Sequence, residues 1–556
     1  MPDNRPGLPD NDFDGRPGAS AAGPPLRVVI AGLGMAGGRL VDDILARARD
    51  GRARRQVKVS VVGAEPYGAY NRVLLSDVVA GRADVAALAL QDPEALRAAG
   101  VDVQLGEHVD AVDLPCDTTA PGAVLLSSGA RLVFDRLVLA TGAEPVVPPL
   151  DGLGTPDRLG APEGPGGADR QPLAGVHVLR TVDDAREIVA ACANARTGVV
   201  LGGGLLGLEA ARGLARRGLT VTVLHSAAHL LEGRLDAAGA AVLARTFRGL
   251  GMTIRCGVSA TGAVTDPVAG PAGTGRLRGI RLSDGEVVPA DLLVLACGVR
   301  ARTAIATAAG LDVARGVLVD DTLTTSDPRV LAIGDCAEHE GRLPGLVAPA
   351  WAQAGVVADR ITGSAPDARW AGHQPVMRLK AADVEVSAVG ACDVDPWSDD
   401  PGTDVVQLLD PGAGRYVKAV VRNGVVVGAA TVGDARAAAD LSLLVERGAA
   451  APVDRTCLVT GARRSAAPDE DPTRLPDRST VCRCNGVTKG AILRAWSAGS
   501  RTRQAMAAST RATTGCGSCT PTVDGLVSWL STTDPDDERL PASARPSVPA
   551  STGGAR

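Results

Sequence analysis

Aromatic residues are scarce in this chain of 556 residues: five Trp, three Tyr and three Phe make up 2% of the sequence. The hydrophobic share is nevertheless 45%, so the core has to be built largely from Ala, Val, Leu and Ile. Few rings remain for stacking on unpaired bases, which argues against a protein that binds single-stranded nucleic acid.

Long apolar runs and an excess of basic charge are also absent. The net charge is −5 with acidic and basic residues interspersed, so no positive footprint for nucleic acid or anionic lipid stands out. No run approaches the ~18–20 apolar residues that span a bilayer, and the polar, Pro- and Gly-rich N-terminus is unlike a signal peptide. We therefore expect a cytoplasmic protein with neither nucleic-acid nor membrane partners.

Seven cysteines are scattered singly, and none forms the C-x4-C pair that a flavin-linked disulfide reductase needs. In a reducing compartment such thiols are expected to be buried as small apolar side chains. These single cysteines are Cys116, Cys192, Cys256, Cys297, Cys336, Cys392 and Cys457. The missing pair removes dithiol chemistry from the candidate functions.

Four further cysteines stand near the C-terminus as a C-x-C pair and a C-x-x-C pair. Four soft, anionic thiolates suit a [2Fe–2S] cluster, in which each short-spaced pair can serve one iron. The same quartet suits a structural zinc ion, which binds four thiolates in a tetrahedral site. The predicted metal ligands are Cys482, Cys484, Cys516 and Cys519. Their spacing alone leaves iron and zinc open.

An apolar strand, a glycine turn and a helical pattern follow one another in LRVVIAGLGMAGGRLVDDILARA. Gly32, Gly34 and Gly37 form G-x-G-x-x-G between strand and helix, so the backbone can approach a pyrophosphate at the positive helix end. Glu65 follows the next strand, VKVSVVGAE, and is placed to accept hydrogen bonds from an adenosine ribose. Its distance from the glycines exceeds the usual ~20 residues, which the basic insertion DGRARRQ explains.

The same arrangement returns in TGVVLGGGLLGLEAARGLARRG, where Gly202, Gly204 and Gly207 lie between a strand and a helix. Two such units in one chain predict two nucleotide-binding folds. The second strand of this later unit ends at His225. A carboxylate there would favour NADH and a nearby Arg would favour NADPH, so His225 decides neither.

Residues 26–365 resemble the two-dinucleotide flavoproteins of the pyridine-nucleotide oxidoreductase family. Two further FAD motifs of that family look like the segments here that contain Thr141 with Gly142 and Gly334 with Asp335. The resemblance implies that Asp335 contacts the ribityl side of FAD. It also implies that FAD and NAD(P)H are the cofactors.

Three residues are candidates for a place beside the flavin. Glu209 matches an acidic position that lies close to the flavin and nicotinamide in relatives, and the alternative is a cap or an ion pair at the interdomain face. Arg72 and the helix beginning near Trp351 are expected to contact the isoalloxazine, with a core role as the alternative for Trp351. Hydride chemistry belongs to the cofactors, so the protein's part is placement, shielding and tuning.

A narrower resemblance comes from EPYGAYNRVLLSDVVAG, GLVAPAWAQAG and YVKAVVRNGVVVGAATVGD. These segments look like the N-terminal half of NAD(P)H-dependent assimilatory nitrite reductases and like electron-transfer subunits of assimilatory nitrate reductases. Related ferredoxin and rubredoxin reductases usually carry Lys where Asp77 follows Ser76, which favours the nitrite and nitrate branch. The cysteine module resembles the bacterioferritin-associated-ferredoxin-like [2Fe–2S] domain of that branch, and a flavin donor on the same chain favours iron over zinc.

The expected fold class is α/β, with two Rossmann-like dinucleotide-binding domains of the two-dinucleotide flavoprotein type, a small α+β domain and a small helical iron–sulfur domain. Asn423-Gly424 is a type I′ hairpin signal within the α+β domain. The expected boundaries are 1–25 and 533–556 for disordered tails, 26–150 with 301–365 for the FAD domain, 176–300 for the NAD(P) domain, 366–450 for the α+β domain, 451–478 for a linker and 479–532 for the [2Fe–2S] domain.

The resemblance implies an NAD(P)H:acceptor oxidoreductase that passes electrons through FAD to the cluster and on to a separate reductase, nitrate reductase first and nitrite reductase second. Full-length nitrite reductases of this kind continue into a sirohaem and [4Fe–4S] half, which this sequence lacks, so we expect the electrons to leave for another protein. The alternatives are a ferredoxin- or rubredoxin-type reductase and, in a different class, a cluster module for iron delivery or partner docking. A homodimer is left open.

Overall fold

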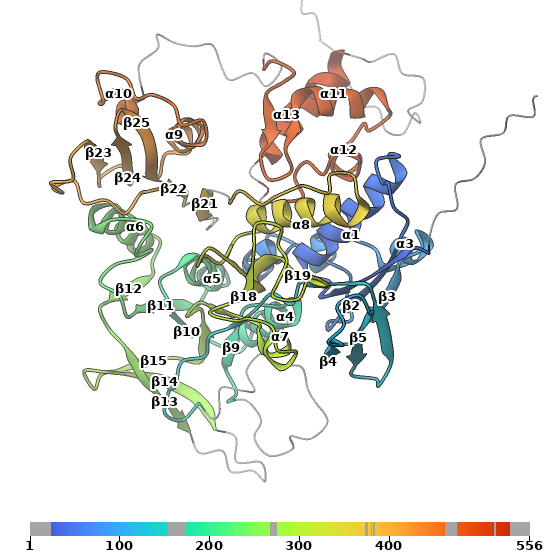
Figure 1. Cartoon of the computed structure of the whole chain (residues 1–556). Helices are drawn as coiled ribbons and strands as arrows, with labels where there is room; N and C mark the ends of the chain where they lie inside the picture. The colour runs from blue at the N-terminus through green and yellow to red at the C-terminus, as the bar shows by residue number, and fades with distance from the viewer. Residues whose placement is uncertain are drawn as a thin grey trace, which may run out of the picture.

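The computed structural model of the chain describes residues 24–153, 173–266, 275–372, 376–379, 381, 384–461, 475–515, 517 and 519–533. Figure 1 shows the elements that these residues form, coloured in chain order. The predicted tails lie almost wholly outside the described residues, and so does the predicted ligand Cys516.

The names FAD domain and NAD(P) domain follow the predicted ligands of the two nucleotide folds. The FAD domain is built on a five-stranded parallel sheet of order β19-β7-β1-β2-β3. Alternate side chains of β1 point to opposite faces: Val28 and Ile30 pack under the helices α1 and α8, and Val29 packs against a small antiparallel sheet, β4-β5-β6. Both faces are therefore buried, which explains why β1 is a continuous apolar run. The bounds are β1 Leu26–Ala31, α1 Met35–Arg49, β2 Val57–Gly63, β3 Asp102–Leu105, β4 Val109–Asp113, β5 Gly122–Leu126, β6 Arg131–Phe134, β7 Arg136–Leu139, β19 Val330–Ala332 and α8 Val347–Thr362.

The NAD(P) domain repeats this plan with a parallel sheet of order β12-β11-β10-β16-β9. Its helices α4, α5 and α6 cover one face, and the antiparallel sheet β13-β14-β15 covers the other. The bounds are β9 Val176–Val178, α4 Val182–Cys192, β10 Thr197–Leu201, α5 Leu205–Arg216, β11 Thr220–His225, α6 Ala237–Gly249, β12 Thr253–Cys256, β13 Ala260–Asp266, β14 Arg276–Leu282, β15 Val287–Pro289 and β16 Leu292–Leu295.

Short elements connect the two domains and shape the edge at which the strands end. Two further small sheets pair β8 with β17 and β18 with β20. The bounds are η1 Arg72–Leu74, α2 Leu75–Val79, η2 Val85–Leu88, α3 Pro93–Ala98, β8 Ala143–Pro145, β17 Val299–Ala301, α7 Ala304–Ala308, β18 Val317–Val319, η4 Gly334–Cys336 and β20 Ala337–His339.

An antiparallel sheet of order β21-β22-β25-β24-β23 forms the α+β domain, next to α6 (Figure 1). Asn423 and Gly424 have φ of 49° and 77°, so the predicted type I′ hairpin is confirmed. The domain continues past residue 450, because Leu458 and Val459 of α10 are buried against the sheet. The bounds are β21 Val376–Leu379, β22 Val386–Gly390, β23 Thr403–Asp410, β24 Arg415–Arg422, β25 Val425–Val432, α9 Ala435–Glu446 and α10 Cys457–Thr460.

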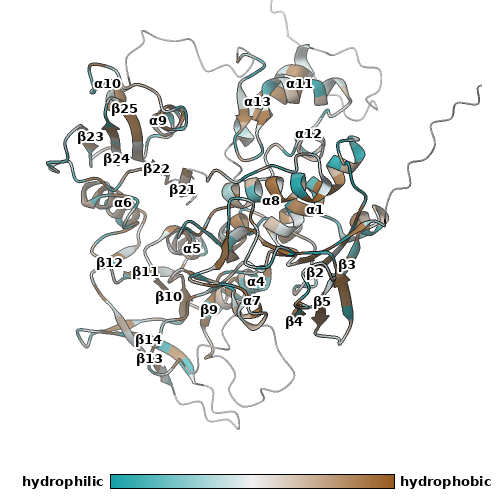
Figure 2. Cartoon of the chain, viewed as in Figure 1, coloured by the Kyte–Doolittle hydropathy of each residue, from teal (hydrophilic) through white to brown (hydrophobic). Residues whose placement is uncertain are grey.

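The last domain is a short hairpin and three helices with a core of their own, centred on Ile492, Met506 and Val523. In Figure 1 it lies beside α1 and α8, and Figure 2 shows apolar residues concentrated in the buried strands and on the inward faces of helices. The bounds are β26 Thr480–Cys482, β27 Val487–Thr488, α11 Lys489–Ser497, α12 Arg503–Thr510 and α13 Thr520–Thr533. The predicted α/β class is confirmed.

The single cysteines are only partly buried as predicted. Cys192, Cys336 and Cys392 are buried, whereas Cys116 is exposed, so the prediction is wrong for that residue. Cys116 lies in the connection between β4 and β5, from which Leu114 rather than Cys116 packs against the core. Over the described residues, no helix is both long enough and apolar enough to cross a membrane.

Candidate functional site

The first glycine turn leaves open space at its middle position. Gly32 has φ of 118°, and a Cβ there would lie 2.2 Å from the carbonyl oxygen of Ala140. A Cβ on Gly37 would lie 1.9 Å from the carbonyl oxygen of Gly32. At Gly34, by contrast, the nearest atom is Nε of Arg72 at 4.0 Å. The outer glycines are thus required by packing, and the middle one faces the space that a pyrophosphate needs.

The second glycine turn has the same construction. Gly202 has φ of 125°, and its Cβ would lie 2.2 Å from the carbonyl oxygen of Ala296, while a Cβ on Gly207 would lie 2.1 Å from that of Gly202. Nothing lies within 4 Å of a Cβ on Gly204. The helices that follow, α1 and α5, have neither a side-chain cap nor an acidic residue in the first turn. Their N-terminal N–H groups therefore suit an anionic group.

The two further motifs predicted for FAD end the strands next to β1. Because β19, β7 and β1 are parallel neighbours, their carboxyl ends meet at one edge of the sheet. Thr141 Oγ1 donates to the carbonyl of Arg302 at 3.1 Å, and Gly334 N donates to Gln353 at 2.8 Å. Asp335 pairs with Arg180 at 2.9 Å. The structure thus brings Gly142 and Asp335 to the same edge as the first glycine turn.

Arginine side chains gather at this edge. Arg72 pairs with Glu65 and donates to the carbonyl of Arg180 at 2.9 Å. Burial alone would lower the pKa of Arg72, but the Glu65 carboxylate holds it above its usual value. Burial also lowers the pKa of Arg302, and the nearby positive charges of Arg180 and Arg72 add to this. Among the described residues the Arg302 guanidinium has no hydrogen-bond or ion-pair partner, so the edge suits a phosphate-bearing ligand.

Glu65 does not point freely into solvent. One carboxylate oxygen pairs with Arg72, and the other accepts a hydrogen bond from the Tyr70 hydroxyl at 2.6 Å. The predicted ribose contact of Glu65 stays a prediction, and it would require Glu65 to share these partners with the ribose.

Glu209 lies at the interface of the two nucleotide-binding domains. It is 9% exposed and accepts a hydrogen bond at 2.9 Å from the hydroxyl of Ser76, on α2. Asp77, which follows Ser76, pairs instead with Arg82. The contact places a buried carboxylate five residues into α5, whose N-terminus follows the second glycine turn.

His225 packs directly against the second glycine turn. A Cβ on Gly203 would lie 2.7 Å from the imidazole carbon Cδ2. Burial lowers the pKa of His225, although the Glu232 carboxylate opposes this. The Nε2 atom of His225 is buried without a hydrogen-bond partner. An unsatisfied nitrogen at this strand end is what a nucleotide site leaves for its ligand.

Three of the four predicted metal ligands are in the described residues. A hydrogen bond shared with Cys519 lowers the pKa of Cys482 to about 6, with help from backbone N–H groups of Thr513 and Asn485. Cys484 lies against Gly515, since a Cβ there would be 2.7 Å from the Cys484 Cβ. No metal-binding group of three or more ligating side chains forms within the described residues alone, and Cys516 lies outside them. The acidified thiol nevertheless fits a thiolate cage.

Trp351 lies between the FAD domain and the cysteine module. Its Nε1 donates to the carbonyl of Met35 at 2.9 Å, and the Arg39 guanidinium stands 5.3 Å from the ring centroid. Its predicted contact with the isoalloxazine stays a prediction. Two residues that contact the predicted site could not be identified from the sequence. Arg180, whose carbonyl accepts a hydrogen bond from Arg72, belongs to no motif. Asn71 donates to Thr514 in the cysteine module, which is 443 residues away in the sequence.

The fold and these turns define a two-dinucleotide flavoprotein with an added cysteine module. Residues 26–354 match the pyridine nucleotide-disulphide oxidoreductase family, residues 375–449 match the rubredoxin NAD+ reductase C-terminal domain, and residues 480–529 match the BFD-like [2Fe-2S] binding domain. The protein therefore belongs to the pyridine nucleotide-disulphide oxidoreductase family. Its cofactors are FAD, NAD(P)H and a [2Fe–2S] cluster, so iron replaces the zinc alternative.

Two curated relatives match nearly the whole chain, and a solved structure matches most of it. The chain is 32% identical over 502 residues to the NAD(P)H nitrite reductase of Bacillus subtilis, covering 90% of this chain and 57% of that protein. It is 31% identical over 515 residues to the assimilatory nitrate reductase electron transfer subunit of the same organism, covering 91% and 60%. A ferredoxin reductase from Rhodopseudomonas palustris is 26% identical with a TM-score of 0.61, covering 76% of this chain and 100% of that one. The chain thus spans less than two thirds of the first two relatives.

Proposed function

We propose that the protein takes electrons from NAD(P)H through FAD to its [2Fe–2S] cluster and passes them to a separate reductase, acting in the cytoplasm. The NAD(P) domain would hold the nucleotide at Gly202, Gly204, Gly207 and His225. The FAD domain would hold the flavin along the edge formed by the first glycine turn, Thr141, Gly142, Gly334 and Asp335. When bound, FAD supplies the conversion between a hydride and single electrons, and the chain positions and shields it.

One observation supports this function most strongly. The cluster module packs on α1 through Asn485 and on Trp351 of α8 through Gly515, and these two helices cover the sheet that we propose binds the flavin. A module that served only iron delivery would not need to pack against these two helices.

Nitrate reductase is the acceptor we propose first, and nitrite reductase the second. Support comes from the relative that is named an assimilatory nitrate reductase electron transfer subunit, which matches 91% of this chain. The test is anaerobic: the purified holoprotein, NADH or NADPH, and a purified assimilatory nitrate reductase catalytic subunit, with nitrite formation as the readout. Nitrite formation that needs all three components supports the proposal. No nitrite formation, alongside rapid reduction of cytochrome c, would overturn the nitrate assignment while keeping the electron path.

A ferredoxin- or rubredoxin-type reductase is the second candidate. The match of residues 375–449 to the rubredoxin NAD+ reductase C-terminal domain favours it. Turnover with a ferredoxin or a rubredoxin far above that with either nitrogen-oxyanion reductase would establish this reading. A Cys516→Ser variant separates both readings from iron delivery, because electron transfer to every protein acceptor should fall while flavin reduction persists.

A further inference from the structure

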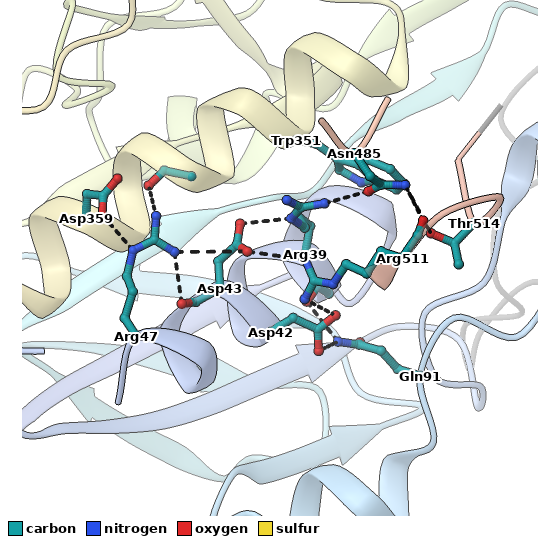
Figure 3. Close-up of polar contacts among 12 residues, drawn as sticks. Arg39, Asp42, Asp43, Arg47, Gln91, Trp351, Asp359, Asn485, Arg511 and Thr514 are labelled. Carbon is teal, nitrogen blue, oxygen red and sulfur yellow. Dashed lines mark hydrogen bonds and ion pairs between the residues drawn. The ribbon is translucent and has the colours of Figure 1, made fainter. Parts of the chain in front are cut away.

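Charged contacts seat the cluster module on one face of α1 (Figure 3). Arg511, which follows α12, pairs from Nη2 with Asp42 at 3.0 Å and from Nη1 with Asp43 at 3.2 Å. Arg39 donates from Nε to Asp43 and from Nη1 to Oδ1 of Asn485, both at 2.9 Å. Asn485 follows Cys484 in sequence, and its amide also donates to the carbonyl of Arg511 at 2.6 Å. One network thus ties α1 to both ends of the cysteine-bearing segment.

A buried amide makes the second contact. Asn71 donates from Nδ2 to the carbonyls of Thr514 and Gly515, at 3.1 Å and 2.9 Å. Its Oδ1 accepts from the backbone N–H of Val73 at 3.0 Å, and the residue is 2% exposed. Because a buried amide loses free energy when it is unpaired, Asn71 holds the backbone before the second cysteine pair against the FAD domain.

Trp351 fills the space between these contacts. It is 5% exposed, and one edge of the indole reaches Met35, the first residue of α1. Another part of the ring faces the module: a Cβ added to Gly515 would lie 3.2 Å from Cζ3 of Trp351 and 3.3 Å from Sγ of Cys484. Only the width of a glycine therefore separates the indole from a cluster ligand.

We propose that Trp351, packed on Gly515, is the positioning residue across which electrons leave the FAD domain for the cluster, and that Asn71, Arg39 and Arg511 hold the module in this electron-accepting position. The inference rests on the proposed function. When bound, FAD would accept a hydride from NAD(P)H, which is two electrons and a proton, and a [2Fe–2S] cluster would accept one electron at a time. Two successive transfers would therefore cross this contact, each electron would go on to a one-electron acceptor protein, and the one proton would return to water.

The physical basis is continuous packing. Electronic coupling between two centres weakens steeply when a gap or water replaces bonded and packed atoms, and a large ring in a dry contact removes that gap. Trp397, in the connection between β22 and β23, is 88% exposed and therefore serves as a comparison residue without such packing.

The first experiment is stopped-flow reduction of the holoprotein by NADH and by NADPH, with flavin and cluster absorbance followed separately. In Trp351→Leu the ratio of the cluster rate to the flavin rate should fall by about tenfold or more, and Trp351→Phe should restore most of it. Trp397→Leu is the matched control and should leave the ratio unchanged. If Trp351→Leu loses flavin, Gly515→Ala tests the same contact, because its methyl group pushes Cys484 and the indole apart.

The second experiment measures docking without turnover, by hydrogen–deuterium exchange. Arg511→Gln and Asn71→Ala should each speed exchange on the α1 face, whereas Arg503→Gln, which breaks an ion pair with Asp524 inside the module, should leave exchange on that face unchanged. A wild-type cluster that NAD(P)H never reduces would refute the proposed function itself. A wild-type ratio in both Trp351→Leu and Gly515→Ala would instead refute this inference and leave the function standing, and unchanged exchange would refute the docking contacts.

Discussion

At the scale of single residues, a substitution of Glu209 tests whether this buried carboxylate takes part in hydride transfer or only stabilises the domain interface. Glu209→Gln is expected to slow hydride transfer to FAD by about tenfold, because a buried carboxylate stabilises the positive charge that the nicotinamide ring acquires as the hydride leaves. The measurement is the limiting rate of flavin reduction at saturating nucleotide. Ser76→Ala keeps the charge and removes only the hydrogen bond, so its loss should be smaller. A rise in KM with no change in the limiting rate would assign Glu209 to nucleotide binding alone.

His225 makes a residue-scale prediction about pH. Burial lowers its pKa from 6.5, so as the pH falls through 6.5 the unfolded chain takes up a proton before the folded chain does. The free energy of unfolding therefore falls over this range, and the contribution of neutral His225 is complete only above it. In His225→Gln the loss of stability between about pH 7.5 and pH 5.5 should be smaller, as measured by urea unfolding without nucleotide. The control is His108→Gln, since His108 is exposed beside Asp110, and an unchanged slope in His225→Gln would contradict the prediction.

At the scale of elements, a buried ion pair joins α6 of the NAD(P) domain to β24 of the α+β domain. Lys418 is 0% exposed, and its Nζ donates at 2.8 Å to Asp236, which caps α6. The Tyr416 hydroxyl donates to the same oxygen of Asp236 at 2.6 Å, and burial raises the pKa of Tyr416. Asp236→Asn should destabilise the α+β domain by about 3–5 kcal/mol, because it leaves the Lys418 charge buried and unpaired.

The matched test of this ion pair removes both charges. Adding Lys418→Met to Asp236→Asn should restore most of the lost stability, since an apolar side chain of similar length replaces the stranded ammonium. Urea unfolding followed by hydrogen exchange of β24 resolves this domain from the others. A double variant that is no more stable than Asp236→Asn would show that the cap and the Tyr416 hydrogen bond, rather than the charge, determine the effect.

Elements of this chain were predictable where the signal is local. Strand, glycine turn and helix follow one another within about 25 residues, so both nucleotide folds could be derived from the two three-glycine turns and the strand and helix around each. Asn423-Gly424 likewise predicted its own hairpin. The pairing of Asp236 with Lys418 could not be predicted, because the partners are 182 residues apart and neither lies in a pattern that names the other. The contact of Arg180 with Asp335 could not be predicted for the same reason, since the two residues are 155 positions apart.

At the scale of the whole molecule, the sequence predicted which domains are present but not how the last one sits on the first. The spacing of the four cysteines predicted a metal site but not its position relative to the other domains. A family resemblance was needed to favour iron over zinc. The seat on α1 depends on Arg39, Asn71 and Arg511, which are an ordinary helix arginine, a turn asparagine and a left-handed helix-end residue when each is considered alone. Only the fold shows that they lie together, and their contacts support the route that we propose from the flavin to the cluster.

Removal of the cluster should therefore leave flavin reduction intact and abolish most electron transfer to acceptor proteins. Cys519→Ser removes a predicted ligand whose sulfur contacts Cys482. Since metal binding energy is folding energy in such a site, the module should lose protection from exchange while the FAD and NAD(P) domains keep theirs. Flavin reduction by NAD(P)H should continue, and reduction of cytochrome c should fall by about tenfold or more because the one-electron outlet is gone. Cys457→Ser is the control, as Cys457 is a free cysteine of the α+β domain. Wild-type cytochrome c reduction in Cys519→Ser would mean that electrons leave directly from the flavin and that the cluster serves another purpose.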